Sequence, residues 1–214
     1  DVGIRQTLEG IPDGKYRLRA AVGNIQQNGA NSTVNAGEKQ TGVTLYAGIY
    51  DMPVDTMKAH KDLYFTVVDG QVTIGFKAEN ATGNWICLDN IRLYYLGGNT
   101  PDDYAAYLSR YADDVREELQ AKHIQSAVRQ AVEAAIEEAE KASAAENPDE
   151  KAMAEAKAAL DEAVTAIEAS AAVYDVLADA LRYAGQVKDW YEEDEEKRGK
   201  METAIQAAPV SYTH

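Results

Sequence analysis

The sequence predicts a multidomain protein of the β-plus-α class, an antiparallel β-sandwich over residues 1–98 followed by an elongated three-helix bundle over residues 101–208. Residues 1–100 contain thirteen of the fifteen glycines and several short runs in which apolar and polar side chains alternate. The remainder is rich in Ala and Glu, with apolar side chains three and four positions apart. Nearly all of the net charge of −15 falls on this second part, where twelve Lys and Arg accompany twenty-six Asp and Glu. Such a split indicates two physically different modules.

Period-two alternation predicts strands in the first module at 16–22, 43–47, 63–67, 72–76 and 85–95. Their inward side chains are expected to be Tyr16, Leu18, Ala20, Val22, Leu63, Phe65, Val67, Val72, Ile74, Phe76, Ile86 and Leu88. Asp69-Gly70 predicts a hairpin between the third and fourth strands. Two long polar stretches, 24–40 and 50–62, are expected to be binding or irregular loops.

Helix starts are predicted at Thr100-Pro101 and Asn147-Pro148, where a capping side chain precedes a proline and acidic residues. A five-residue step between Leu119 and Ile124 predicts a bend or a helix break near Lys122. After the second start, apolar or small side chains form a coiled-coil-like seam that Gly185 is expected to end. The seam comprises Met153, Ala156, Leu160, Ala163, Ile167, Ser170, Tyr174, Leu177, Leu181 and Ala184. A weaker helix is predicted over 188–207, interrupted by Gly199.

Four stretches of the first module, 6–16, 42–48, 70–76 and 85–93, together resemble the galactose-binding-like jelly rolls of carbohydrate-binding modules in Bacteroidota surface proteins. The helical module resembles the Ala-rich FIVAR repeats of bacterial surface proteins. Such jelly rolls begin with one or two further strands, so the resemblance implies that N-terminal strands are missing here and that a sheet edge is exposed.

Composition and motifs argue against several classes of function. Phosphate recognition needs clustered basic residues, so the acidic balance argues against a nucleic-acid partner. No window reaches the roughly 18 apolar residues of a membrane-spanning helix. None of the three histidines stands in a catalytic or metal-binding pattern, and the single cysteine, Cys87, is expected to be a small buried side chain. We therefore expect no enzyme activity.

Sugar binding needs an aromatic ring for the apolar face of a pyranose and planar polar groups for its hydroxyls. Arg19, Tyr46, Tyr50, Asn84 and Trp85 are the candidates. For each aromatic, packing against another element is an equal alternative. For Arg19 a surface ion pair is the favoured alternative.

By resemblance, Asp89 matches a last-strand aspartate that binds structural calcium in several such modules. Calcium prefers hard oxygen ligands of this kind. The residues themselves favour the alternative, in which Asp89 makes a strand-end hydrogen bond. No other cofactor is expected.

These observations predict a non-catalytic, extracellular or cell-surface carbohydrate-binding protein whose helical bundle is a spacer. A protein-binding adhesin or assembly module is the first alternative. In this alternative the helical bundle contacts a protein partner. Trp190 and Tyr191 are of the residue types that dominate interface hot spots. An accessory fragment of a glycoside-processing enzyme is the second alternative.

Overall fold

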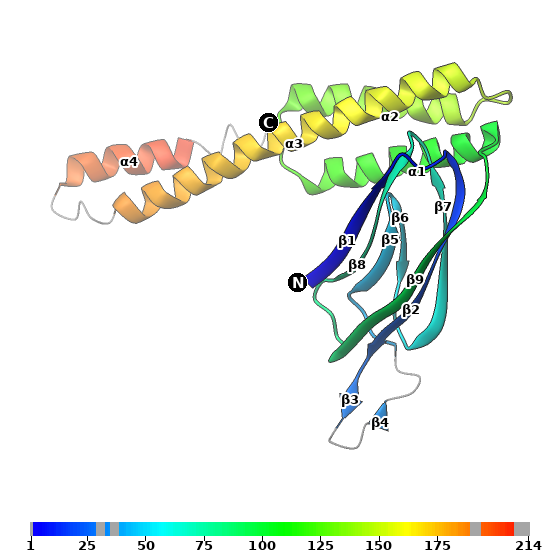
Figure 1. The fold of residues 1–214 in the computed structure, drawn as a ribbon. Helices are drawn as coiled ribbons and strands as arrows, with labels where there is room; N and C mark the ends of the chain where they lie inside the picture. Colours follow the sequence, from blue (N-terminus) through cyan, green and yellow to red (C-terminus); the bar gives the residue numbers. More distant parts are fainter. Residues whose placement is uncertain (1, 29–32, 35–38, 189–193, 208–214) are drawn as a thin grey trace. The chain divides into compact units, whose positions relative to one another are not determined.

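The computed structural model describes residues 2–28, 33–34, 39–188 and 194–207 (Figure 1). The chain divides into two compact units, Asp1–Tyr107 and Leu108–His214. The strands belong to the first unit and the helices follow them in the chain. The predicted order of a β-rich part before a helical part is therefore confirmed.

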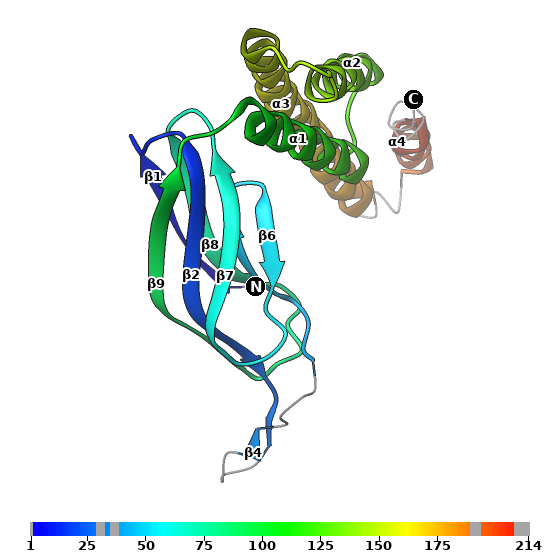
Figure 2. The ribbon, with the colours of Figure 1, turned by 90° about the vertical axis from the view of Figure 1, so that its right-hand side faces the viewer.

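Two antiparallel sheets make up most of the first unit. One has the order β1-β8-β5-β6, formed by β1 (Val2–Glu9), β8 (Gln71–Ala78), β5 (Val43–Ala47) and β6 (Tyr50–Pro53). The other has the order β7-β2-β9, formed by β7 (Lys58–Val67), β2 (Gly14–Ile25) and β9 (Trp85–Gly97), which lie side by side in Figure 2. A separate short ladder joins β3 (Gln27–Asn28) to β4 (Thr33–Val34).

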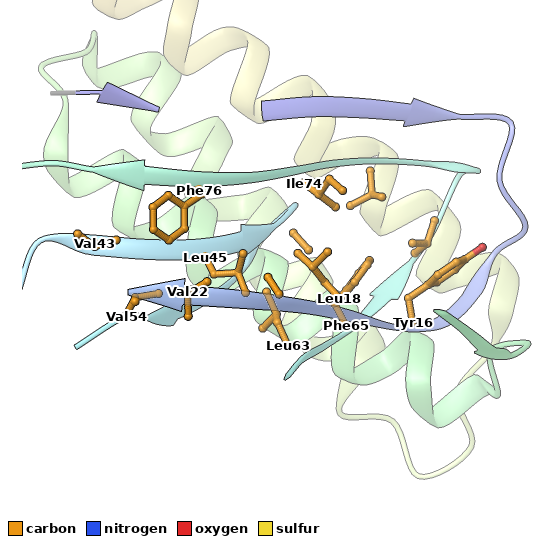
Figure 3. Close-up of a cluster of buried hydrophobic side chains, with 14 of the residues drawn as sticks. Tyr16, Leu18, Val22, Val43, Leu45, Val54, Leu63, Phe65, Ile74 and Phe76 are labelled. Carbon is orange, nitrogen blue, oxygen red and sulfur yellow. The ribbon is translucent and has the colours of Figure 1, made fainter. Parts of the chain in front are cut away.

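The hydrophobic core lies between the two sheets (Figure 3). Leu18 from β2 and Leu45 from β5 are each 1% exposed, and Tyr16 stacks on Phe65 with ring centroids 5.7 Å apart. The predicted inward residues of β2, β7 and β8 are all buried, because alternate side chains of a strand share one face. Those predicted on β9, Ile86 and Leu88, are only half-buried.

The predicted hairpin at Asp69-Gly70 is wrong. Both residues have positive φ, as a tight turn requires, but the turn connects β7 of one sheet to β8 of the other. It is held by the neighbouring turn: the Gly70 N–H donates to Asp13 Oδ1 at 2.7 Å, and the Ile11 N–H donates to the Gly70 carbonyl at 3.0 Å. The flanking Val67 and Val68 are both buried, so the turn carries the chain across the core.

The predicted loop over 50–62 is also wrong. Tyr50 begins β6, which pairs with β5 through a turn in which Gly48 has φ of 56°. β7 already begins at Lys58. The segment looks polar because β6 is an edge strand with alternately exposed side chains.

Four helices follow: α1 (Pro101–Ala121), α2 (Ser126–Ser143), α3 (Glu150–Lys188) and α4 (Glu195–Ala207). The predicted break near Lys122 is confirmed by the end of α1 at Ala121. None of the helices in the described residues is long and apolar enough to cross a membrane. Trp190-Tyr191 lies outside the described residues.

The seam of α3 is buried from Met153 to Tyr174, and beyond Tyr174 its members are only half-buried. Gly185 does not end the helix, because α3 continues to Lys188. One glycine inside a helix costs only about 1 kcal/mol relative to alanine, which the flanking helix can tolerate. The predicted start of a last helix at 188 is therefore wrong, since Lys188 ends α3 and α4 begins at Glu195.

The two predicted helix starts have different outcomes. Thr100 caps α1, since its Oγ1 accepts the Asp103 N–H at 3.2 Å while Asp103 Oδ2 accepts the Thr100 N–H at 2.9 Å. For α3 the cap is Asp149 rather than Asn147, because Asp149 Oδ1 accepts the Lys151 N–H at 3.1 Å. At the first start the proline directly follows the cap, whereas at the second the proline directly precedes it.

This capping box predicts a dependence of stability on pH. Hydrogen bonds from the Thr100 side chain and backbone, then from Lys15 at 3.1 Å, lower the pKa of Asp103 to about 2. The ionised Asp103 carboxylate therefore stabilises the folded protein fully above about pH 4, and this stabilisation disappears as the pH falls through about 2. We expect Asp103→Asn to cost about 1–2 kcal/mol at pH 7, after allowance for the partial exposure of the carboxylate.

Denaturant titrations of both proteins between pH 2 and pH 7 measure this difference. Asp102→Asn, at an exposed position in the same helical turn, is the matched control and is expected to change little. A constant gap between the Asp103→Asn variant and the wild type at all pH values would contradict the prediction.

Candidate functional site

The outer face of sheet β7-β2-β9 carries two of the residues that sequence analysis assigned to sugar binding, Arg19 and Trp85, together with polar and aromatic side chains that it did not assign. The register pairs Arg17 with Tyr64 on one side and Tyr94 on the other, and it pairs Arg19 with Asp62 and Arg92 in the adjacent row. We call these two rows the arginine–tyrosine face, comprising Arg17, Arg19, Asp62, Tyr64, Arg92 and Tyr94.

In the first row a guanidinium lies between two phenol rings. Arg17 Cζ is 4.4 Å from the centroid of the Tyr94 ring, within the range of a cation–π contact. Tyr64 is 58% exposed on the other side of Arg17. The row therefore brings two tyrosines and a guanidinium group together on the outer face, with the guanidinium over one of the rings.

In the second row two arginines are direct neighbours across the β2–β9 ladder. Arg19 lies opposite Arg92, and Asp62 lies on the far side of Arg19. Asp62 Oδ1 is 3.8 Å from the Nε atoms of both Arg17 and Arg19, which exceeds hydrogen-bond length. Arg92 donates from Nε to Asn90 Oδ1 at 2.9 Å. One carboxylate thus lies beside two of the three guanidinium groups.

A β-bulge positions this part of β9. Asn90 has φ of 53°, and the register shifts between Arg19 and Ala21 so that three steps on β9 match two on β2. The extra residue places Asp89 and Arg92 on the same outer face. Without it, strict alternation would turn Arg92 and Tyr94 toward the core.

Two further predicted residues share the outer face of this sheet. Asp89 pairs with Ala21, and Trp85, which is 46% exposed, pairs with Ile25 at the far end of β2. Six residues of strand separate Arg19 from Ile25, a distance of about 20 Å along the sheet. Between them the central strand carries only the small residues Ala21 and Gly23.

The other predicted ligand residues lie elsewhere. Tyr46 is on β5 of the other sheet, and its ring covers Gly75, where an added Cβ would lie 2.3 Å from the ring. Tyr50 packs against the core, with its ring centroid 6.3 Å from that of Phe65. Asn84 is bound to the backbone of Gln27 through both its amide nitrogen and its oxygen, each at 2.7 Å.

The predicted calcium ligand Asp89 is exposed, and its Oδ1 accepts the Asn90 N–H at 2.7 Å. In the part of the chain that is described, no three His, Cys, Asp or Glu side chains gather as a metal site. Calcium requires six to eight oxygen ligands, so Asp89 would need partners beyond its present neighbours.

An open groove of about 520 Å³ lies between the edges of the two sheets, where β1 and β9 face each other. Within the described residues, β1 pairs only with β8 and β9 only with β2, so one edge of each strand is open. Ile4 is 62% exposed and Ile91 49% exposed at its rim. The apolar lining includes Ile4, Leu8, Ile74, Leu88, Ile91 and Leu93.

Sequence analysis missed Arg17, Tyr64, Arg92 and Tyr94. For Arg17 and Tyr64 the alternation contained the necessary information, because each directly precedes a predicted inward residue. For Arg92 and Tyr94 it did not, since the bulge reverses the alternation along β9.

No protein-family model, curated protein or solved structure matches this chain.

Proposed function

We propose that residues 1–98 form a galactose-binding-like jelly roll that binds carbohydrate without catalysis, along the arginine–tyrosine face. The observation that carries the proposal is the row in which Arg17 lies between Tyr64 and Tyr94. Aromatic rings offer an apolar surface to the C–H face of a pyranose, and guanidinium groups donate in a plane to its hydroxyls.

The ligand that suits this face is an extended chain of sugars. Aromatic side chains occur at both ends of the outer surface, at Tyr64 in the row of Arg17 and at Trp85 opposite Ile25, about 26 Å apart by the rise of the strand. Ala21 is small, and the side chains of Met57 and Cys87 cover Gly23, so the centre is filled and the surface is shallow. A shallow surface buries little of each sugar unit, so affinity would come from several units bound together.

In this proposal the protein is extracellular or attached to a cell surface, and the helices form a bundle that acts as a spacer. A spacer needs a stable core and a polar surface. The buried stretch of α3 from Met153 to Tyr174 contributes to the core. The acidic residues of the helical part make its surface polar.

The decisive variant is Tyr64→Ala. We expect it to weaken binding to the best ligand of a glycan array about tenfold, a loss of about 1.4 kcal/mol, because an exposed ring would lose its contact with the sugar. Isothermal titration calorimetry measures the affinity. The melting temperature should hardly change, since the side chain is 58% exposed.

Tyr183→Ala is the matched control, because Tyr183 is 61% exposed on α3 of the second unit. It is expected to bind like the wild type. Equal losses in both variants, or no glycan bound by the wild-type chain, would refute the proposed function.

The open groove between β1 and β9 favours a second candidate, a protein-binding adhesin or assembly module. A strand from a protein partner could pair with the open edge of β9 and cover Ile91. Sedimentation velocity and pull-down experiments separate the two: an inert monomer that recovers no partner argues against assembly. An accessory role in glycoside processing would require a catalytic domain in the same polypeptide.

A further inference from the structure

The arginine–tyrosine face concentrates positive charge in a unit whose remaining residues are acidic on balance. Residues 1–107 contain four arginines, and three of them, Arg17, Arg19 and Arg92, lie in the two rows of this face. Arg5, on β1 of the other sheet, is the fourth. An arrangement that collects most of the arginines on one face calls for a physical reason.

Without a ligand, this clustering of arginines lowers the stability of the folded protein. Arg19 and Arg92 are directly opposite each other, and like charges at such positions destabilise a sheet. Asp62 offers one carboxylate, at 3.8 Å from Arg17 and Arg19. Asp89, the next carboxylate along the face, accepts the Asn90 N–H with its Oδ1.

Two buried polar atoms in this cluster are unsatisfied. Arg17 Nε and Asp62 Oδ1 are both shielded from solvent and have no hydrogen-bond partner. These two atoms lie 3.8 Å from each other, beyond hydrogen-bond length, so Asp62 does not fully satisfy the guanidinium groups beside it. The side chains of Arg17 and Arg19 are 26% and 32% exposed, and Arg92 is exposed.

We infer that the carbohydrate bound by this face is acidic, a sugar bearing a carboxylate or sulfate group that is held between Arg19 and Arg92. The inference rests on the proposed carbohydrate-binding function. A guanidinium fork matches the two oxygens of a carboxylate or sulfate, and an anion between the two arginines removes their mutual repulsion. The flanking tyrosine rings contact the apolar face of the same or a neighbouring sugar.

Non-specific attraction does not account for such binding. The whole chain carries a net charge of −15, and its field repels polyanions. An acidic polysaccharide that binds must therefore be held at a local basic site.

The experiment compares four polysaccharides with the full chain by calorimetry and affinity electrophoresis: polygalacturonate, dextran sulfate, neutral galactan and neutral dextran. We expect an acidic polymer to bind at least tenfold more tightly than its neutral counterpart. Binding of polygalacturonate identifies the carboxylate, and binding of dextran sulfate identifies the sulfate.

Arg19→Gln and Arg92→Gln are each expected to weaken acidic binding at least tenfold, with little change in melting temperature. Arg92→Lys keeps the charge but loses the fork, and is expected to lose about fivefold. Arg5→Gln removes the same charge from the other sheet and is expected to stay within twofold of the wild type.

Preference for a neutral polymer would overturn this inference and leave carbohydrate binding standing. Equal losses in the Arg5→Gln and Arg92→Gln variants would also overturn it, since the effect would then be one of net charge. Absence of binding to all four polymers and to the glycan array would overturn both proposals.

Discussion

Leu18→Ala is expected to lower the free energy of unfolding of the β-rich unit by about 3–4 kcal/mol. Leu18 is 1% exposed and lies on β2, the central strand of its sheet, facing the core between the sheets. Removal of its side chain deletes buried apolar surface and leaves a cavity that a central strand cannot collapse to fill. Chemical denaturation followed by far-ultraviolet circular dichroism measures the loss.

Two controls make this result specific. Ile4→Ala removes a similar side chain that is 62% exposed at the rim of the groove, and is expected to cost less than about 1 kcal/mol. Ile167→Ala removes a fully buried side chain of α3. It should lower the free energy of unfolding of the helical unit and leave that of the β-rich unit unchanged. If Ile4→Ala lowered the free energy of unfolding as much as Leu18→Ala does, Ile4 would be buried and the groove would not be open.

Asn24→Asp is expected to destabilise the same unit by about 3–5 kcal/mol at pH 7, although the two side chains have almost the same shape. Asn24 is 0% exposed, and its amide donates to the carbonyls of Val54 at 2.9 Å and Thr41 at 3.2 Å. A carboxylate has no proton to donate and would face both carbonyl oxygens in a dry site. Thermal and urea unfolding at pH 7 and pH 5 measure the effect, which should shrink at the lower pH as the introduced carboxyl is protonated.

Asn84→Asp is the matched control for this prediction. Asn84 also donates its amide to a backbone carbonyl, that of Gln27 at 2.7 Å, but its side chain is exposed. Water can replace the lost hydrogen bond there, so the expected cost is about 1 kcal/mol. Similar costs for the two variants would show that burial of Asn24 is not the deciding factor.

Local patterns in the sequence predicted the elements and most of the core. Alternation identified the buried residues of β2, β7 and β8, because a side chain's face depends only on its position in the strand. Thr100 was identified as a helix cap because a capping box involves residues within one turn. These features depend on interactions between near neighbours in the chain.

The assignment of strands to sheets required the tertiary structure. Asp69-Gly70 adopts the positive φ values expected of a hairpin, yet it joins strands of different sheets. A turn of this geometry can connect two strands of one sheet or two strands of different sheets. Which connection forms depends on the contacts of the turn with Asp13 and Ile11, which are far away in sequence. Tyr50 was likewise placed in a loop because its partner strand could not be identified from local composition.

The candidate site was predicted only where it follows from strand position. Arg19 and Trp85 were placed on an outer face by alternation, and they lie there. The bulge at Asn90 brings Arg92 and Tyr94 to that face, and the pairing of β2 with β7 brings Asp62 and Tyr64. By itself the sequence determined most of the strands, the start of the first helix and most of the core, because those depend on periodicity and on near neighbours in the chain. The tertiary structure alone decided which residues meet across three strands, because cross-strand register depends on the packing of the whole unit.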